Sequence, residues 1–130
     1  MSFPLPEPTP LSQPYWDALK QGRLMFQRCR HCNHAWLPPR AECPECLGDA
    51  WDWTTASGHG RVVSWVTYHH AYHEAFKERL PYNVTLVELD EGPRLITNVV
   101  NPEAGIKADR LVELRIEQEH GVALARFALI

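Results

Sequence analysis

Two closely spaced pairs of cysteines constrain this chain more than any other feature. Cys29 and Cys32 form the first pair, Cys43 and Cys46 form the second, and ten residues separate the pairs. Each pair can contribute two thiolates to one metal ion, and the intervening segment is long enough to bring the second pair round to complete a tetrahedral site. Four sulfur ligands leave no open position for water, so the metal is expected to hold structure rather than to catalyse.

Three other uses of four cysteines fit the sequence less well than zinc. A secreted protein could form two disulfides, but residues 1–10 show neither the basic start nor the apolar core of a signal peptide. A thioredoxin-like redox site needs one pair at the start of a helix, not two matched pairs. Iron in a rubredoxin-like site stays an alternative, because both ions accept four thiolates in tetrahedral geometry.

The composition indicates a soluble protein with one or two small domains, and we expect it to be cytoplasmic. The chain has 130 residues, of which 45% are apolar and 22% charged, and its net charge is −3. No apolar run approaches the length of a membrane span. Four thiolates around one Zn²⁺ would add about two more negative charges, so the surface offers no overall attraction to duplex nucleic acid. We therefore expect neither a membrane nor nucleic acid as a partner.

Residues 1–22 are expected to form an extended arm followed by a short helix. Prolines alternate with other residues from Pro4 to Pro10, which removes amide donors and favours an extended backbone. Ser12 can then cap the helix.

The short helix carries an apolar stripe. Tyr15, Trp16 and Leu19 lie at helical spacing, and the helix is expected to run to about Lys20 and to end at Gly22. A helix of this length is not stable alone in water, so the stripe must pack on the ribbon, on the next domain or on another chain. Tyr15 and Trp16 are therefore candidate docking residues.

Residues 23–56 are expected to form the metal-bound ribbon. Trp36, Trp51 and Trp53 are predicted to shield the metal site by packing, so at most one of them is expected to be free for an interface. Arg40, in the segment between the two cysteine pairs, is a further candidate docking residue.

Residues 57–130 show the period-two alternation of β-strands. Val, Ile, Thr and Leu dominate them, and tight turns are expected around Gly92 and Gly121. The predicted strands span 61–68, 83–90, 94–100, 111–118 and 122–129. Five strands with hairpins at these places fit an OB-fold barrel, with an SH3-like barrel as the nearest rival. The predicted fold is thus mainly β: a short N-terminal helix, a rubredoxin-like zinc ribbon and a C-terminal five-stranded OB-fold.

The segment between the first and second of these strands is rich in histidine and tyrosine. Together with the last turn it supplies candidates that could face a ligand or a partner: Tyr68, His69, His70, Tyr72, His73, Tyr82 and His120. In OB-folds these two loops flank the ligand face, so the histidines could converge on one mouth.

Three hypotheses compete for this histidine-rich segment. A histidine could act as a general base oriented by Glu74. His69 and His73 could bind a metal if the loop were helical. The loop could instead pack on the barrel or on a partner, and this hypothesis is favoured because no set of nucleophile, base and orienting group is recognisable. No catalytic residue is assigned to the chain.

A nucleic-acid-binding protein is the alternative function. Zinc ribbons and OB-folds both occur in such proteins, and Trp65 could stack on a base. However, the charge count shows no basic groove of the kind that single-strand binders use. Four arginines near the ribbon could form a local basic patch, which would also suit the phosphates of coenzyme A: Arg23, Arg28, Arg30 and Arg40.

Several short motifs follow one another in the order of one known family. They are Tyr15-Trp16, Gly22-Arg23-Leu24, Gln27-Arg28-Cys29-x-x-Cys32, Pro38-Pro39-Arg40, Cys43-Pro44-x-Cys46, Gly58-x-Gly60-x-Val62-x-Ser64, Pro81-Tyr82 and Leu89-Asp90-Glu91-Gly92. With them the chain resembles, from about residue 12 to 128, the family called domain of unknown function 35. It departs from the family near its end, where Ala125-Arg126-Phe127 stands in place of a common proline–aromatic pair.

The resemblance implies an accessory subunit rather than a stand-alone enzyme. Members of the family accompany thiolase-fold proteins, including thiolases, hydroxymethylglutaryl-CoA synthases, acyltransferases and retro-aldolases of steroid side-chain degradation, and some sit beside hot-dog-fold hydratases. The partner supplies the catalytic residues. For this chain the resemblance therefore implies structural zinc, a thiolase-fold partner in a two-plus-two assembly, and acyl-CoA near the interface.

Overall fold

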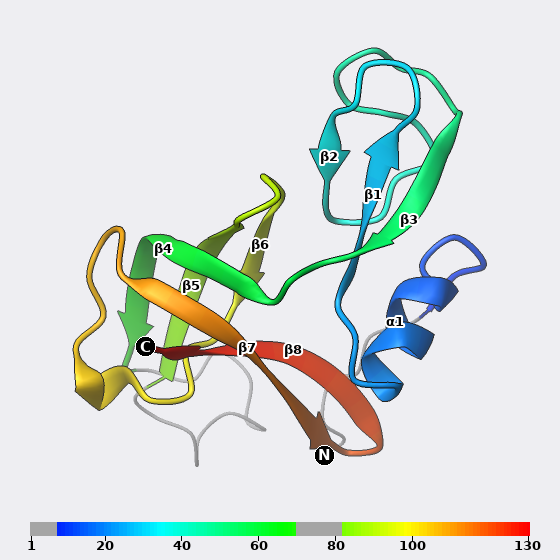
Figure 1. Cartoon of the computed structure of the whole chain (residues 1–130). Helices are drawn as coiled ribbons and strands as arrows, with labels where there is room; N and C mark the ends of the chain where they lie inside the picture. The colour runs from blue at the N-terminus through cyan, green and yellow to red at the C-terminus, as the bar shows by residue number, and fades with distance from the viewer. Residues whose placement is uncertain (1–7, 70–81) are drawn as a thin grey trace.

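The structure is a computed structural model that describes residues 8–69 and 82–130 (Figure 1). The described residues form one short α-helix, then a three-stranded sheet, then a five-stranded sheet. This is the mainly β architecture that the sequence predicts. No helix within the described residues is long and apolar enough to cross a membrane.

Helix α1 (Gln13–Lys20) ends in a Schellman motif. The N–H of Gly22 donates to the carbonyl of Leu19 at 3.1 Å, and the N–H of Arg23 donates to the carbonyl of Ala18 at 2.8 Å. Gly22 has a φ of 82°, a conformation that costs glycine little. The predicted C-terminal end of the helix is confirmed.

The N-terminal end of α1 differs in one detail from the prediction. Ser12 occupies the N-cap position, but its side chain makes no capping hydrogen bond. Its hydroxyl instead accepts the N–H of Thr9 at 2.8 Å. The first N–H of the helix, that of Gln13, donates to the carbonyl of Thr9 at 2.8 Å, so the preceding turn already provides an acceptor there.

The ribbon is a small antiparallel sheet with the strand order β2-β1-β3. Its strands are β1 (Met25–Cys29), β2 (Ala35–Trp36) and β3 (Trp51–Thr55). Because β1 is central, its last residue delivers the first cysteine to the tip of the sheet, where the two loops that carry the remaining cysteines also meet (Figure 1).

The second sheet has the strand order β6-β5-β4-β7-β8. Its strands are β4 (His59–Tyr68), β5 (Tyr82–Leu89), β6 (Arg94–Thr97), β7 (Leu111–Glu119) and β8 (Val122–Leu129), and a short 3₁₀ helix, η2 (Pro102–Ala104), precedes β7. Four of the five strands begin and end within two residues of the prediction.

The remaining strand, β6, ends at Thr97 and not at Val100, so its predicted end was wrong. The chain leaves the edge of β5 after Thr97 and crosses to β8. Val99 forms a parallel bridge with Phe127, and the hydroxyl of Thr97 donates to the carbonyl of Ala125 at 2.7 Å. The first and last strands of the sheet therefore meet, and the sheet is a nearly closed five-stranded barrel.

Helix α1 packs on the barrel. Leu19 is 1% exposed and lies in one core cluster with Val62 and Phe127, and Tyr15 and Trp16 pack against the same cluster. The sequence allowed the apolar stripe to pack on the ribbon, on the next domain or on another chain. The structure shows it packed on the next domain, the barrel. Burial of a leucine side chain of this kind stabilises a fold by about 2 kcal/mol.

Candidate metal centre and docking surface

The first cysteine knuckle is a tight turn that starts at Cys29. The N–H of Cys29 donates to the carbonyl of His34 at 2.8 Å, and the N–H of Asn33 donates to the carbonyl of Cys29 at 3.1 Å. The N–H of His31 points at the Cys29 sulfur, 3.3 Å away. Asn33 follows Cys32 with a φ of 66°, which asparagine tolerates.

The second knuckle repeats the first, bond for bond. The N–H of Cys43 donates to the carbonyl of Gly48 at 2.8 Å, and the N–H of Leu47 donates to the carbonyl of Cys43 at 2.9 Å. The N–H of Glu45 lies 3.4 Å from the Cys43 sulfur. Leu47 follows Cys46 with a φ of 62°. A leucine in this conformation is strained, which indicates that the knuckle geometry imposes it.

The four sulfurs fit one tetrahedral ion. All of them lie within 4.8 Å of one another, and the pairs Cys29–Cys46 and Cys32–Cys43 are both separated by 3.5 Å. Thiolates about 2.3 Å from zinc in a tetrahedron are roughly 3.8 Å apart. No disulfide joins the four cysteines. The residues present therefore match a structural four-thiolate site.

Hydrogen bonds from the backbone favour the thiolate form that a metal requires. The backbone of Cys32 is the largest cause that lowers the pKa of the Cys29 thiol to about 6, and that of His31 adds to it, while burial acts in the opposite direction. Backbone hydrogen bonds act in the same direction on Cys32 and Cys46, but there burial and neighbouring thiols outweigh them and raise both pKa values.

Tryptophans pack beside the metal site, as predicted. Trp36 is 4% exposed and shares a small core with Cys29 and Cys43, and Trp51 packs against this core. The indole of Trp51 meets those of Trp36 and Trp53 edge to face, at centroid distances of 6.5 and 5.7 Å. The ribbon core consists largely of the ligands themselves and these rings.

The arginines that could form a basic patch near the ribbon are largely occupied by internal contacts. Arg30 forms a two-point ion pair with Asp52, at 2.8 and 2.9 Å. Arg28 lies over a phenylalanine ring, 5.3 Å from its centroid, and Arg23 donates to a neighbouring glutamine.

Arg40 is the exception, because its side chain makes no hydrogen bond, ion pair or ring contact with any described residue. The side-chain amide of Gln27 holds both backbone groups of Arg40. It donates to the Arg40 carbonyl at 2.7 Å and accepts the Arg40 N–H at 2.8 Å. Gln27 is fully buried. The side chain of Arg40 is exposed on a rigid support.

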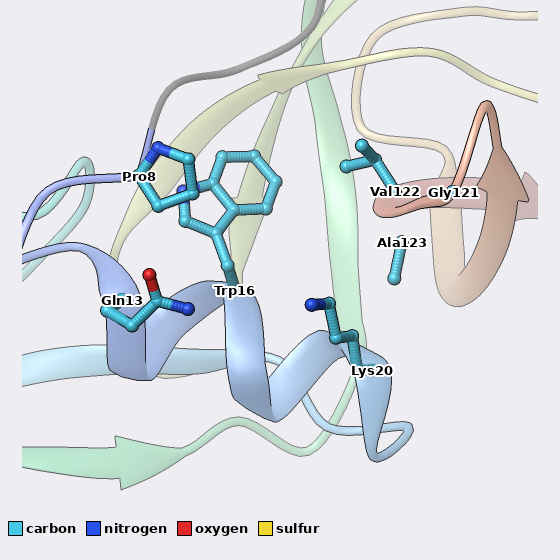
Figure 2. A pocket seen from close by; sticks show the side chains of 7 residues that line it. All are labelled: Pro8, Gln13, Trp16, Lys20, Gly121, Val122 and Ala123. Carbon is cyan, nitrogen blue, oxygen red and sulfur yellow. The ribbon is translucent and has the colours of Figure 1, made fainter.

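Trp16 separates two pockets at the junction of α1 with the barrel. Figure 2 shows its indole between Pro8 and the start of β8, with Gln13 and Lys20 from the same helix lining this pocket of about 130 Å³. A larger pocket of about 510 Å³ contains Trp16 and Tyr15. Burial raises the pKa of Tyr15 to about 12, so its hydroxyl stays protonated.

The larger pocket also contains Leu95 and Ile96 of β6, which the sequence pattern predicts only as strand residues. One signal could have singled out Ile96. Ile96 lies between Leu95 and Thr97, whose side chains point inward, so its own apolar side chain points outward.

The histidine-rich segment is only partly described. His70, Tyr72 and His73 lie outside the described residues. Tyr68 and Tyr82 stack across β4 and β5, with ring centroids 5.3 Å apart.

The expected convergence of His69 with His120 does not occur. β7 pairs antiparallel with the first three residues of β4 and then runs on past the start of β4. His69 follows the last residue of β4, whereas His120 follows the last residue of β7. The two histidines therefore lie at opposite ends of the strand pair.

Two family models match the chain. The rubredoxin-like zinc ribbon domain of ChsH2 matches residues 16–52, and the C-terminal OB-fold domain of ChsH2 matches residues 53–117. This chain belongs to the DUF35 family. As a DUF35 protein it has a structural zinc site, formed by Cys29, Cys32, Cys43 and Cys46.

Curated relatives carry scaffold or subunit names. A probable enoyl-CoA hydratase alpha subunit from Thermomonospora curvata is 44% identical over 75% of this DUF35 chain. DUF35 domain-containing scaffold proteins from Methanocaldococcus jannaschii and Methanothermobacter thermautotrophicus are 31% and 35% identical, each over 66% of the chain. The chain spans less than two thirds of the length of these relatives: 28% of the hydratase subunit, and 62% and 65% of the scaffold proteins.

Two solved structures resemble this DUF35 protein. The Ltp2-ChsH2(DUF35) aldolase contains a chain that is 36% identical with a TM-score of 0.83, over 96% of this chain and 98% of that one. A DUF35 protein of unknown function from Sulfolobus solfataricus is 17% identical with a TM-score of 0.68, over 93% and 86% of the two chains, and shares the fold.

Proposed function

We propose that this DUF35 protein is a non-catalytic accessory subunit. It binds and stabilises a thiolase-fold enzyme that acts on acyl-CoA or acyl groups, and it helps to shape the substrate site of that enzyme. The observation that carries the proposal is the match to the Ltp2-ChsH2(DUF35) aldolase, which extends over nearly the whole length of both chains.

The metal site supports an accessory role. Four cysteine sulfurs surround the ion position, so zinc there has no position for a water or a substrate. Zinc binding contributes directly to the folding free energy of so small a ribbon. The chemistry is left to the partner.

The hydratase name of one relative supports a partner that acts on CoA esters. Two enzyme classes are candidates for the partner. A thiolase-fold subunit in a two-plus-two assembly is the first candidate, and a hot-dog-fold hydratase is the second.

Co-purification tests the proposal. The tagged protein is isolated from its native host at moderate salt, and stoichiometric partners are identified by mass spectrometry. Recovery of a thiolase-fold or hot-dog-fold enzyme is the expected result. Recovery of nucleic acid without such an enzyme, with binding that falls steeply as salt rises, would establish the ribbon-and-barrel nucleic-acid binder instead.

The histidine-rich segment is proposed to face the entrance of the partner's active site. This rests on its content of histidine and tyrosine. Alanine at both Tyr72 and His73 should change the turnover of the assembled complex. Unchanged kinetics together with unchanged assembly would refute this placement without touching the accessory role.

A further inference from the structure

The barrel is open along part of one seam, between β6 and β8. Near Phe127 the seam is closed, because Val100 donates its N–H to the carbonyl of Phe127 at 2.9 Å and Phe127 donates its N–H to the carbonyl of Asn98 at 3.1 Å. Toward Arg94 no backbone hydrogen bond joins the two strands within the described part of the chain. β6 is an end strand there, and Trp16 of α1 borders the opening.

The register of β5 with β6 shows which backbone groups face the open seam. The N–H of Leu89 donates to the carbonyl of Pro93, opposite it, at 2.8 Å. Bonded and non-bonded pairs alternate along an antiparallel ladder. Leu95 is therefore bonded to β5, whereas Arg94 and Ile96 present their N–H and C=O groups to the seam.

These edge groups have no partner of their own. No backbone hydrogen bond of Arg94 or Ile96 toward the seam occurs among the residues that the structure describes. Ile96 is also 76% exposed. An exposed apolar edge with free backbone groups is a template for another strand.

The larger pocket adjoins this edge. Tyr15 and Trp16 contribute from α1, Leu37 and Pro38 contribute from the segment after β2, and Ile96 contributes from β6. With a volume of about 510 Å³ and mostly apolar walls, it can accept a large apolar side chain.

The rim of the pocket carries two arginines. Arg94 lines it and also lines an adjoining pocket of about 310 Å³ that contains Arg40 and His34. Arg94 pairs with Glu88, and the second partner of Glu88, Arg61, also pairs with Asp109. Arg40 has no ion pair among the described residues, so it is the cation at this end of the seam that still lacks a carboxylate.

We propose that an extended segment of the partner enzyme subunit adds a strand to the open edge of β6. Its backbone pairs with the N–H and C=O groups of Arg94 and Ile96, an apolar side chain fills the pocket beside Trp16, and an acidic side chain meets Arg40. The inference rests on the proposed function, because it assigns the segment to that enzyme subunit.

The free backbone groups favour a polypeptide over the other occupants. An acyl chain could fill the apolar pocket, but it has no donors or acceptors for the edge of β6. A second copy of this chain pairing through the same edge would bring a second Arg40 there instead of a carboxylate, and like charge disfavours this. A strand with one apolar and one acidic side chain can bond to the backbone of β6, fill the pocket and pair with Arg40.

Hydrogen–deuterium exchange with residue-level readout tests the docking mode, on the free protein and on the complex purified with its enzyme subunit. Exchange at Arg94 and Ile96 is expected to be fast in the free protein and at least tenfold slower in the complex. Leu95 is the internal control, because its N–H is already bonded to β5 and exchanges slowly in both states.

The other outcomes are distinguishable. Unchanged exchange at Ile96 in a stoichiometric complex overturns strand addition and leaves the accessory role standing. Slowing that appears in the free protein as its concentration rises indicates a second copy and also overturns the inference. Failure to recover any enzyme subunit overturns the inference and the proposed function together.

One variant gives an independent measurement. Ile96→Pro removes the N–H that faces the seam and leaves the bonds of Leu95 and Thr97 to β5 in place, a position that edge strands accept. Its affinity for the enzyme subunit is expected to fall about tenfold, whereas Ile96→Val binds like the wild type. Equal affinities of the two variants, with equal zinc content, overturn the inference.

Discussion

Both polar groups of the Asn83 side chain pair with the backbone of Val99. The amide nitrogen donates to the Val99 carbonyl at 2.9 Å, and the amide oxygen accepts the Val99 N–H at 2.8 Å. Asn83 is 6% exposed. Its side chain thereby takes over the pairing at the point where the chain leaves β5 to reach β8, so it helps to hold the barrel closed.

The first prediction concerns this bridge. Asn83→Ala leaves a buried N–H and a buried carbonyl of Val99 without partners, which should cost about 3 kcal/mol of unfolding free energy. Asn101 is the matched control, because it makes the same two-way bridge to Leu129, at 3.2 and 2.8 Å, from a partly exposed position. Water can replace the bridge there, so Asn101→Ala should cost about 1 kcal/mol. Equal losses in urea titrations would contradict the role given to burial.

The second prediction concerns the close approach of two strands at Gly60. A Cβ on this residue would lie 2.5 Å from the carbonyl oxygen of Glu88 and 3.1 Å from a methyl carbon of Val87. Gly60→Ala should therefore destabilise the barrel by about 2 kcal/mol, a typical cost of overpacking. Gly92→Asn is the control: no atom lies within 4 Å of a Cβ there, so only the strain of its φ of 112° remains, and its loss of unfolding free energy should be smaller.

The third prediction concerns zinc. Cys43→Ser should abolish zinc binding, and the ribbon should then lose its structure and its solubility. Trp36 and Trp51 pack on the ligands, so their fluorescence should shift to the red while the circular dichroism of the barrel persists. His31→Ala, next to the site but not a ligand, should keep one zinc per chain by elemental analysis. Full metal content in Cys43→Ser would contradict the four-ligand assignment.

The fourth prediction concerns pH. Hydrogen bonds from Arg94 and then from Arg61 hold the pKa of Glu88 below its ordinary value of 4.5. The unfolded chain therefore binds this proton more tightly than the folded one. The contribution of these hydrogen bonds to the free energy of unfolding is fully present above pH 4.5. It disappears as the pH falls through the lower pKa that Glu88 has in the folded protein.

The measurement for Glu88 compares Glu88→Gln with the wild type in urea titrations across this range. The variant should be less stable at neutral pH, and the two curves should converge in acid. Glu103→Gln changes the net charge by the same amount at an exposed residue of η2, and it should follow the wild type throughout. A constant difference between Glu88→Gln and the wild type would show that the ion pairs are not its cause.

Local patterns were sufficient to predict most of the elements. The Cys-x-x-Cys spacing encodes a knuckle within a few residues, and both knuckles close through bonds between near neighbours, such as Leu47 with Cys43. The alternation of apolar side chains likewise placed four of the five barrel strands. The bounds of β6 could not be predicted in this way, because Val99 is apolar at a strand-like position but pairs with Phe127.

The sequence by itself determined the metal ligands, the succession of helix, ribbon and barrel, and the apolar stripe of α1, because each of these depends on contacts between residues close in the chain. Only the tertiary structure decided that His69 and His120 lie apart, that Leu19 packs into the barrel, and that Arg94 and Ile96 face an open seam. These properties depend on strand register and barrel closure, which join residues tens of positions apart and leave no local pattern.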